Sequence, residues 1–425
     1  MAMVDRGFLI SWASPLARWV KRSSSSGITL SLWCSSMGLR PARWGPGHEA
    51  IGYQCLEALT PPPMALPPIL PLPDAESPGD LPQELVQRVQ EALSAGELVA
   101  IPTETVYGLA ARGDDPDAIE RLRTVKGRSP EAPFTWHAGS GERPLEGEVP
   151  LGALVRRLTE RYWPGPLTLV LPHIPKGLEA VAQDGWLGIR VPAHGGTRAL
   201  LDGLPFPVVA SSANGSGEEP LTDAGTVASR FEDQVNCVLD GGPSPLAMGS
   251  SVLRLGPDRF DLLREGCLNA EDLRRAAGLR LLFVCTGNTC RSPMAEGLAR
   301  ALLAERLGSS DLSRFGFEVQ SAGVFAGPGS PASHEAVELL KPRSIDLSDH
   351  RSQPADETLL QQSDRIYCLT RDHRNLLSER TSQKAQLLDP HGEDIPDPIG
   401  GGRAVYAACA EKIEACLRER MQEWV

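Results

Sequence analysis

The sequence contains one stretch in which a nucleophile and an anion-holding group lie close together. Four apolar residues, 281–284, precede Cys285, and a loop that contains glycine and asparagine then leads to Arg291, Ser292 and Pro293. This order predicts a buried parallel strand, a tight loop and a helix that begins near Pro293, with Ser292 as its N-cap. Because the N–H groups of such a loop converge on one point, the stretch predicts an oxyanion site, most often for phosphate.

The two reactive side chains of this stretch suit chemistry on a phosphate group. Cys285 would sit in the positive field of the loop, which favours the thiolate, the reactive form of cysteine. Arg291, six residues later, can donate two parallel hydrogen bonds to phosphate oxygens. A Cys-x5-Arg pair alone arises by chance about once in a sequence of this composition, and a lone cysteine in an apolar strand is as often a core thiol. The prediction therefore depends on the strand, glycine, Ser-Pro and helix around the pair.

Residues 284–296, Val-Cys-Thr-Gly-Asn-Thr-Cys-Arg-Ser-Pro-Met-Ala-Glu, closely resemble the low-molecular-weight protein phosphatases. The resemblance extends from about Gly278 to the C-terminus and includes Ile-Pro-Asp-Pro at 395–398, which is similar to the family's general-acid loop. It implies that Cys285 attacks phosphorus and that Arg291 and the loop amides hold the phosphate oxygens. It also implies that Asp397 protonates the leaving group and then activates water. No cofactor is expected for this domain.

The same resemblance implies supporting roles around the phosphate loop. Ser292 would donate a hydrogen bond to the Cys285 thiolate. Cys290 lies in the same loop as Cys285, so the two can form a reversible disulfide under peroxide; the alternative is a core thiol without a redox role. The expected loop and support residues are Thr286, Gly287, Asn288, Thr289, Cys290, Ser292, Ser321 and His350.

Substrate choice in this domain depends on few positions. Tyrosine-directed members of the family usually carry a bulky aliphatic residue where Thr289 stands, and aromatic residues after Asp-Pro, where Ile399 stands. The loop matches the protein-arginine phosphatase branch of the family. We therefore expect phosphoarginine as the substrate, with phosphotyrosine and then arsenate reduction as alternatives.

Further polar clusters occur in the preceding 200 residues, at the ends of apolar segments where site residues usually lie. Lys126 and Arg128 flank a glycine and can hold one polyanion, and Ser212 and Asn214 follow an apolar strand. Each cluster alone is weak, because Lys-Gly-Arg is usually a solvated turn and Ser-x-Asn usually a capping loop.

Taken together, these clusters resemble the YrdC-type threonylcarbamoyl-adenylate synthases over roughly residues 83–266. Pro-Thr-Glu-Thr-Val-Tyr-Gly-Leu at 102–109 matches a family strand, and Trp-Pro-Gly-Pro-Leu-Thr at 163–168 is also similar. The resemblance implies that L-threonine, bicarbonate and ATP, with Mg²⁺ on its phosphates, condense to threonylcarbamoyl-adenylate for tRNA modification. The residues expected to bind ATP or threonine are Thr103, Thr105, Tyr107, Lys126, Arg128, Arg190, Ser212, Asn214, Ser250 and Arg264. No metal ligand among the protein side chains is predicted.

The chain departs from this second family in places. Pro-Phe-Thr-Trp-His at 133–137 replaces the usual Pro-Leu-x-x-His-Val, the stretch after Ser251 lacks the usual pattern, and residues 138–150 look shortened. Three possibilities remain open: an active synthase, a synthase with an altered substrate, and a nucleotide-binding domain that has lost catalysis. In the last case the chain would be a phosphotyrosine phosphatase tethered to a nucleotide sensor.

Length and composition set the boundaries of these domains. The 425 residues predict two or three domains, and the net charge of −12 argues against a surface devoted to nucleic acid. Nine cysteines without a paired spacing predict a reducing compartment, and no apolar run reaches the ~18 residues of a membrane span, so we expect a cytoplasmic enzyme.

We predict a disordered or Pro-rich extension over 1–80, a synthase domain over 81–269, a linker over 270–279 and a phosphatase domain over 280–425. The Pro-rich run to residue 79 is expected to be a stiff linker without a core, and a targeting segment is the alternative for the N-terminus.

The expected fold class is α/β in both domains. The first should be a YrdC-like twisted sheet around a concave cavity, and the second a Rossmann-like (flavodoxin-like) parallel sheet with a phosphate-binding loop. Helical periodicity appears at 81–95, 118–124, 154–162, 226–231 and 270–279. Strand patterns appear at 98–102, 167–171, 187–191, 208–210 and 237–239, and at 251–255 with 260–264 as a hairpin.

Overall fold

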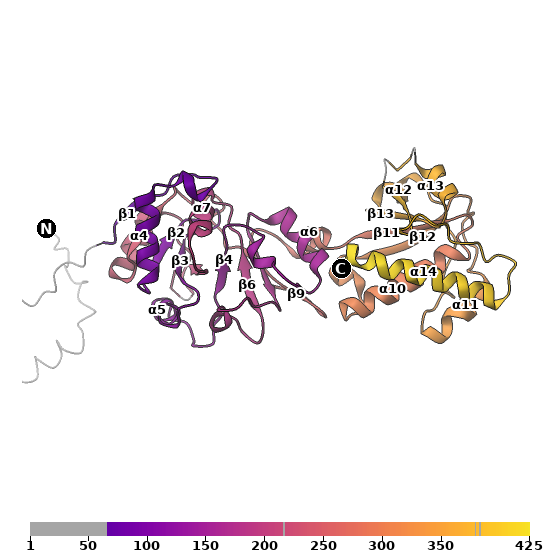
Figure 1. The fold of residues 1–425 in the computed structure, drawn as a ribbon, viewed down its shortest axis with the longest axis horizontal. Coiled ribbons are helices and arrows are strands. Elements are labelled where there is room, and N and C mark those ends of the chain that lie inside the picture. The colour runs from indigo at the N-terminus through magenta and orange to yellow at the C-terminus, as the bar shows by residue number, and fades with distance from the viewer. Residues whose placement is uncertain (1–65, 216, 379, 382–383) are drawn as a thin grey trace, which may run out of the picture. The chain divides into compact units, whose positions relative to one another are not determined.

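The computed structural model describes residues 66–425, apart from residues 216, 379, 382 and 383 (Figure 1). The predictions made for residues 1–65 lie outside the described residues. The described chain contains a ten-stranded sheet and a four-stranded sheet. None of its described helices combines the length and the apolar character that crossing a bilayer requires.

The first sheet is mixed, and its strands and helices come from residues 69–277. The strands are β1 Ile69–Pro71, β2 Val99–Ile101, β3 Gly108–Arg112, β4 Thr135–His137, β5 Leu167–Leu171, β6 Leu187–Arg190, β7 Val208–Ser212, β8 Cys237–Asp240, β9 Ser251–Gly256 and β10 Arg259–Arg264. The helices are α4 Gln83–Ser94, α5 Pro116–Lys126, α6 Gly152–Tyr162, α7 Gly195–Gly203, α8 Ala224–Phe231 and α9 Ala270–Ala277. The strand order is β1-β8-β2-β3-β7-β4-β6-β5-β9-β10.

Both faces of this sheet are buried at β2. Along β2, Val99 and Ile101 pack with α4 and α7 in one apolar cluster, whereas Ala100 packs with α5 in the other. Successive side chains of a strand point to opposite faces, so a strand of three apolar residues serves both layers. Figure 1 shows α4 and α5 at different places around the strands, in agreement with these two clusters.

The prediction of a linker without a core over the Pro-rich run was wrong. β1 pairs with β8 in parallel, with Ile69 opposite Val238, and Leu72 and Ala75 are 4% and 7% exposed in the core. The apolar residues between the prolines fit the sheet because β1 lies at its edge, where proline does not interrupt a ladder on both sides. Residues 69–75 therefore contribute an edge strand and two buried side chains to the first sheet.

The prediction of a strand over residues 102–109 was also wrong for most of that segment. β2 ends at Ile101 and β3 begins at Gly108, so the residues between them form the connection of an antiparallel pair. Thr103 Oγ1 accepts hydrogen bonds from the N–H groups of Thr105 and Val106 and donates to the Val106 carbonyl at 2.6 Å. Such side-chain bonds to nearby backbone favour a turn over a strand.

The second sheet is parallel and has four strands. Its strands are β11 Arg280–Cys285, β12 Glu318–Gly323, β13 Arg365–Cys368 and β14 Ala385–Leu387, in the order β12-β11-β13-β14. Its helices are α10 Arg291–Leu307, α11 His334–Leu340, α12 Glu357–Gln362, α13 Arg371–Leu377 and α14 Arg403–Trp424. The predicted α/β fold class is confirmed for both sheets.

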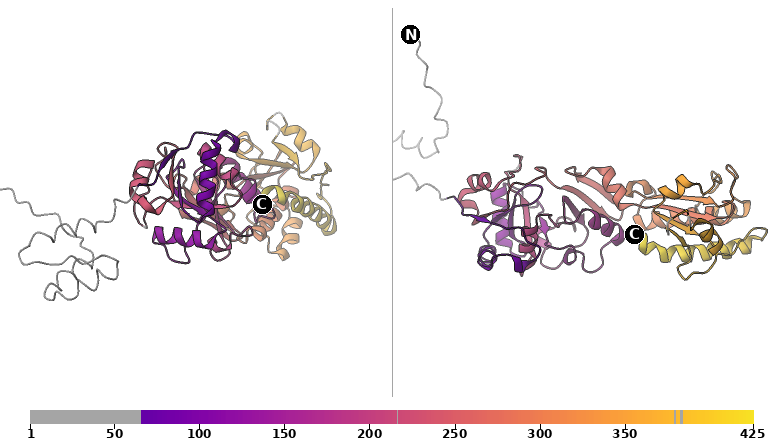
Figure 2. Two further views of the ribbon diagram at one scale, coloured as in Figure 1. Left: turned by 60° about the vertical axis from the view of Figure 1, so that its left-hand side comes forward. Right: turned by 90° about the horizontal axis from the view of Figure 1, so that it is seen from above.

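The central strand of this sheet directs its side chains to two helical layers. Leu281, Phe283 and Cys285 join the cluster that includes residues of α10 and α14, whereas Leu282 and Val284 join a cluster with residues of α12 and α13. Figure 1 and the right-hand view of Figure 2 show α14, in yellow, running along the orange strands. In a parallel sheet all carboxyl ends meet at one edge, where ligands usually bind.

The helix after the loop begins earlier than predicted, and the predicted cap was wrong. α10 starts at Arg291, with Cys290 at the N-cap position and no side-chain cap. Ser292 lies in the first turn, and its hydroxyl contacts Cys285 and Asn288 instead of capping the helix. The loop is therefore about two residues shorter than the sequence suggested, and Ser292 contacts the loop from the first turn of α10.

Candidate active sites

The loop between β11 and α10 surrounds the sulfur of Cys285. Cys285 is 3% exposed, its Sγ lies 3.0 Å from Ser292 Oγ, and the Asn288 N–H donates to it at 3.3 Å. Both groups can donate hydrogen bonds to this sulfur. The structure thus brings Cys285, Ser292 and Asn288 together as predicted from the motif.

The side chain of Asn288 fixes the shape of this loop. Asn288 has a left-handed backbone, with φ 57°, which asparagine tolerates better than most residues. Its Nδ2 donates to Ser292 Oγ and Ser321 Oγ, both at 2.9 Å, and its carbonyl lies 2.8 Å from His350 Nε2. The Gln353 N–H donates to Asn288 Oδ1 at 2.9 Å. The predicted support residues Asn288, Ser321 and His350 therefore meet in one network.

The buried guanidinium of Arg291 pairs with the carboxylate of Asp397. Arg291 Nη2 contacts Asp397 Oδ2, and Nη1 donates to the Ile395 carbonyl at 3.2 Å. The side chain of Arg291 is 5% exposed and that of Asp397 is 40% exposed. The Ile399 N–H donates to the other oxygen of Asp397 at 3.2 Å. The two motifs, about 110 residues apart in sequence, thus meet at the carboxyl edge of the second sheet.

Thr289, the residue expected to influence substrate choice, and its neighbour Cys290 both contact residues outside the loop. The Ser333 N–H donates to the Thr289 carbonyl at 2.8 Å, and Thr289 Oγ1 lies 3.6 Å from Cys290 Sγ. Cys290 is buried, with its Sγ 3.3 Å from the hydroxyl of Tyr406 on α14. Burial, followed by the contact with Cys290, raises the pKa of Tyr406 to about 12. The tyrosine hydroxyl is therefore protonated and able to donate at neutral pH.

Sequence analysis missed three residues that contact this site. His373 Nε2 lies 2.9 Å from Thr286 Oγ1, Tyr406 contacts Cys290, and Glu296 accepts a hydrogen bond from Ser321 Oγ at 2.7 Å. Glu296 lies inside the matched motif and follows Ser292 by one helical turn, so the helical period places it on the side of the loop. The other two come from distant helices, and nothing in the local sequence marks them.

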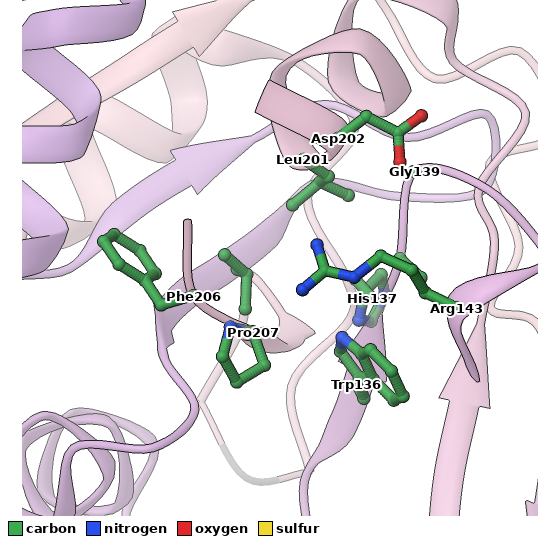
Figure 3. A pocket seen from close by; sticks show the side chains of 10 residues that line it. Trp136, His137, Gly139, Arg143, Leu201, Asp202, Phe206 and Pro207 are labelled. Carbon is green, nitrogen blue, oxygen red and sulfur yellow. The ribbon is translucent and has the colours of Figure 1, made fainter. Parts of the chain in front are cut away.

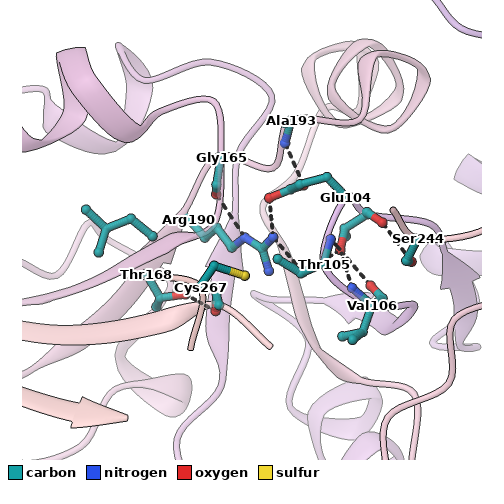
Figure 4. A network of polar contacts seen from close by, with 12 residues as sticks. Glu104, Thr105, Val106, Gly165, Thr168, Arg190, Ala193, Ser244 and Cys267 are labelled. Carbon is teal, nitrogen blue, oxygen red and sulfur yellow. Dashed lines mark hydrogen bonds and ion pairs between the residues drawn. The ribbon is translucent and has the colours of Figure 1, made fainter. Parts of the chain in front are cut away.

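In the first sheet, Arg190 is the centre of a polar network. Its Nη2 bonds Glu104 Oε1 at 2.6 Å and Thr105 Oγ1 at 2.7 Å, and Glu104 Oε2 accepts the Ala193 N–H at 2.7 Å (Figure 4). The side chains of Arg190 and Glu104 are 6% and 11% exposed. Figure 4 shows Cys267 beside Arg190 as well. Glu104 was part of the quoted motif but not among the predicted site residues.

Lys126 contacts Ser212 and Asn214, the two residues of the predicted Ser-x-Asn signature. Its Nζ contacts the Ser212 and Asn214 carbonyls and lies 2.8 Å from Asn214 Oδ1, and Ser212 Oγ donates to the same oxygen at 2.5 Å. Burial, followed by the nearby positive charge of Arg128, lowers the pKa of Lys126 to about 8. The structure therefore brings Lys126, Ser212 and Asn214 together, with a lysine that loses its proton more easily than usual.

Arg128 lies apart from these direct contacts. Its guanidinium donates to the Pro133 carbonyl at 3.2 Å and covers the ring of Phe134, with its carbon 5.5 Å from the ring centroid. Burial lowers the pKa of Arg128. The phenylalanine that departs from the family pattern at 134 therefore gives this arginine an aromatic support.

Of the remaining predicted residues of this domain, Thr105 and Tyr107 are buried in the core, and Ser250 and Arg264 are hydrogen-bonded to each other. Thr105 and Tyr107 are fully buried, and the Tyr107 hydroxyl donates to the Gly242 carbonyl at 2.8 Å, so neither faces solvent. Ser250 Oγ lies 2.9 Å from Thr168 Oγ1, and Arg264 donates to the Ser250 carbonyl at 3.0 Å. Within the described residues, no group of three or more His, Cys, Asp or Glu side chains is placed to hold a metal ion.

A small cavity lies beside these residues, between the first sheet and α7. It measures about 10 Å³ and is lined by residues that include Trp136, His137, Arg143, Asp202 and Phe206 (Figure 3). That volume is about the minimum for one water molecule, so the cavity does not accommodate a substrate. Burial, followed by the charge of Arg190, lowers the pKa of His137 to about 3. His137 is therefore a neutral core residue.

Comparisons with known proteins agree with this division of the chain. A family model described as telomere recombination matches residues 91–266, and one described as low molecular weight phosphotyrosine protein phosphatase matches residues 280–424. The first region is similar to the threonylcarbamoyl-AMP synthase of Pyrococcus abyssi, at 37% identity over 48% of this chain and 60% of the relative. It is also similar to a putative threonylcarbamoyl-AMP synthase of Mycobacterium tuberculosis, at 35% identity over 44% of this chain and 87% of the relative.

The second region has a separate relative. It is similar to the protein-arginine-phosphatase of Bacillus subtilis, at 37% identity over 33% of this chain and 92% of the relative. The chain thus spans most of the length of the Mycobacterium tuberculosis and Bacillus subtilis relatives, and 60% of the length of the Pyrococcus abyssi relative.

Proposed function

We propose that this chain, which belongs to both the YrdC/Sua5 family of threonylcarbamoyl-AMP synthases and the low-molecular-weight phosphatase family, catalyses one reaction with each domain. The domain boundaries that we propose are 69–269, which adds β1 to the expected 81–269, and 280–425, joined by 270–279. The first domain makes threonylcarbamoyl-adenylate from L-threonine, bicarbonate and ATP and releases pyrophosphate. The second removes phosphate from phosphorylated proteins. The observation that supports this most strongly is the meeting of Cys285, Arg291 and Asp397 at one sheet edge.

The contacts of the second site suit hydrolysis in two steps. In the first step the Cys285 thiolate attacks phosphorus, the sulfur–phosphorus bond forms, and the leaving group departs with a proton from Asp397. In the second, water gives its proton to Asp397 and attacks phosphorus, so that the thiolate and inorganic phosphate are released. Arg291 and the loop N–H groups stabilise the equatorial oxygens in both steps.

Phosphoarginine is the substrate that we favour for this site. Its support is Thr289, whose hydroxyl can accept a hydrogen bond from a guanidinium, together with the protein-arginine-phosphatase relative. Ile399, which follows the Asp-Pro pair, is 71% exposed and aliphatic, so it offers no aromatic partner for a phenol ring. Phosphotyrosine is the alternative.

The specificity is tested with matched phosphoarginine and phosphotyrosine peptides on the full chain. We expect the wild type to hydrolyse phosphoarginine faster, and Thr289→Ile to reverse that preference because it replaces a hydroxyl with an apolar group. Cys285→Ser is the control and should lose activity on both peptides. Faster hydrolysis of phosphotyrosine by the wild type would overturn the choice of phosphoarginine.

In the first domain, the support for synthase activity is a set of cations near the ends of the strands. Lys126, Arg128 and Arg264 can balance the charges of ATP, bicarbonate and the threonine carboxylate, whereas the charge of Arg190 is balanced by Glu104. Mg²⁺ would enter on the ATP phosphates, as the resemblance to the synthases implies. The product would supply the enzymes that modify tRNA.

The competing function for the first domain is nucleotide sensing without catalysis. Pyrophosphate release by the full chain, with and without threonine and bicarbonate, separates the two. We expect release only when ATP, threonine and bicarbonate are all present, and a large loss in Asn214→Ala, which removes the side-chain partner of Lys126. ATP binding without pyrophosphate release would favour the sensor, and with it a phosphotyrosine phosphatase as the chain's only enzyme.

A further inference from the structure

A histidine that the assigned roles do not use, His373, lies beside the phosphate loop. It belongs to α13, which follows β13, and β13 pairs with β11 so that Cys368 is opposite Val284. Because the two strands run in parallel and end at the same edge, the start of α13 lies next to the loop that begins after Cys285. His373 is 4% exposed, so its ring is enclosed by the protein.

Both ring nitrogens of His373 have hydroxyl partners. Nε2 lies 2.9 Å from Thr286 Oγ1, and Nδ1 lies 2.9 Å from Thr370 Oγ1. Thr370 is also the N-cap of α13, because its hydroxyl oxygen accepts the N–H of His373. Burial, followed by the positive charge of Arg291, lowers the pKa of His373 to about 4, so the ring is neutral at pH 7. The ring is thus fixed at both ends and adds no charge to the site.

Thr286 connects this histidine to the arginine of the phosphate site. Arg291 Nη2 donates to Thr286 Oγ1 at 3.3 Å, and the same nitrogen pairs with Asp397. Thr286 is exposed, and an exposed hydroxyl without a partner would rotate among its staggered positions. A hydroxyl oxygen has one proton and two lone pairs, so a bond to His373 in either tautomer leaves a lone pair for Arg291.

We propose that His373 is a positioning residue for Arg291. Its ring holds the Thr286 hydroxyl, and that hydroxyl together with the Ile395 carbonyl fixes two nitrogens of the guanidinium in the plane that phosphate binding requires. The inference rests on the proposed phosphatase function, in which Arg291 binds the transferring phosphoryl group. His373 itself does not touch the phosphate, because it acts through Thr286.

The test uses the full chain, p-nitrophenyl phosphate as substrate and inorganic phosphate as a competitive inhibitor that reports on Arg291. We expect His373→Leu and Thr286→Val each to lower kcat/KM about tenfold and to weaken inhibition by phosphate, because each removes the same hydrogen bond near a charged group. The double variant should lose little more than either single variant, since neighbours in one network are not additive. His373→Gln should restore most of the activity, because an amide offers both a donor and an acceptor.

A general loss of structure would give different results. His391, whose side chain is 72% exposed, provides the matched control, and His391→Leu should keep wild-type kinetics. If His373→Leu fails to fold, Thr286→Val and His373→Gln still decide the matter. Wild-type inhibition by phosphate in Thr286→Val, or losses that multiply in the double variant, would overturn the inference while the phosphatase function stands. Absence of turnover in the wild type would instead overturn the proposed phosphatase function and this inference with it.

Discussion

The two candidate active sites each hold a buried arginine against a carboxylate, but the carboxylates differ in their freedom. In the first sheet, Arg190 and Glu104 are both nearly inaccessible, and the second oxygen of Glu104 is held by the Ala193 N–H. In the second sheet, Arg291 is equally buried, whereas the side chain of Asp397 is 40% exposed. Only the second pair therefore has one member that solvent reaches.

This difference separates an ion pair that maintains a structure from one that can take part in a reaction. Removing one member of a fully buried pair leaves an uncompensated charge, so such a pair stays closed. Asp397 can instead be solvated when phosphate replaces it on Arg291, and it can then exchange a proton with the leaving group. The loop around it includes Gly400, whose φ of 74° favours glycine and allows this segment a conformation that other residues resist.

The largest expected effect is on catalysis in Asp397→Asn. We expect hydrolysis of phosphoarginine to fall about 10²- to 10⁴-fold, because the leaving group loses its proton donor. The loss should be smaller with p-nitrophenyl phosphate, whose leaving group needs less protonation. Rates on both substrates check this, and equal losses would show that Asp397 does not act as the acid.

A comparable effect, on stability instead of activity, is expected in Glu104→Gln. The free energy of unfolding should fall by about 3–5 kcal/mol, because the buried Arg190 would lose its counter-charge. Denaturant unfolding of both variants gives the comparison, and Asp397→Asn should be the less destabilised because its exposed carboxylate is already screened by solvent. A larger stability loss in Asp397→Asn would reverse the roles that we assign to the two pairs.

Each arginine also has a neutral histidine nearby, and the one with the lower pKa, His137, should make the fold sensitive to acid. The pKa of His137 is lowered from 6.5 to about 3, so between these values the unfolded chain binds a proton that the folded chain does not. His137 therefore lowers stability as pH falls through this window, by up to ~5 kcal/mol over the whole window. His137→Asn retains a donor for the Thr135 carbonyl, which His137 Nδ1 contacts at 3.0 Å, without titrating.

The measurement is the free energy of unfolding of the wild type and His137→Asn from pH 7 to pH 4. We expect the wild type to lose stability faster than the variant, whose remaining loss comes from the carboxylates common to both. Parallel curves for the two proteins would show that His137 does not carry this sensitivity.

What the sequence predicted well was local, and what it missed was brought together by the fold. The strand at 167–171 and the hairpin at 251–255 with 260–264 follow from alternating apolar residues and a turn, and the structure has them within one residue. Cys285 and Arg291 flank one loop, so their spacing and the residues around them indicated a shared site. His373 and Tyr406 reach that loop from α13 and α14, and no local pattern records which distant helix will pack there.

The errors have an equally physical origin. The prolines before residue 74 suggested a linker, but β1 is an edge strand and needs only one bonded side. Serine is a common N-cap residue, but the hydroxyl of Ser292 contacts the sulfur of Cys285 and the side-chain amide of Asn288 instead. In each case a tertiary contact decided between two local structures that the sequence allowed.

The smallest expected effect concerns an ion pair whose two side chains are both exposed, in contrast to the pairs of Arg190 and Arg291. Arg275 Nη2 and Glu271 Oε1 on α9 are 2.6 Å apart, as close as Arg190 and Glu104, but their side chains are 66% and 75% exposed. Glu271→Gln should therefore change the free energy of unfolding by less than about 0.5 kcal/mol, because water and salt screen an exposed pair. Denaturant unfolding at low and high salt measures this. A loss near that of Glu104→Gln would mean that distance, and not burial, sets the strength of these pairs, and the contrast between Glu104 and Asp397 would lose its basis.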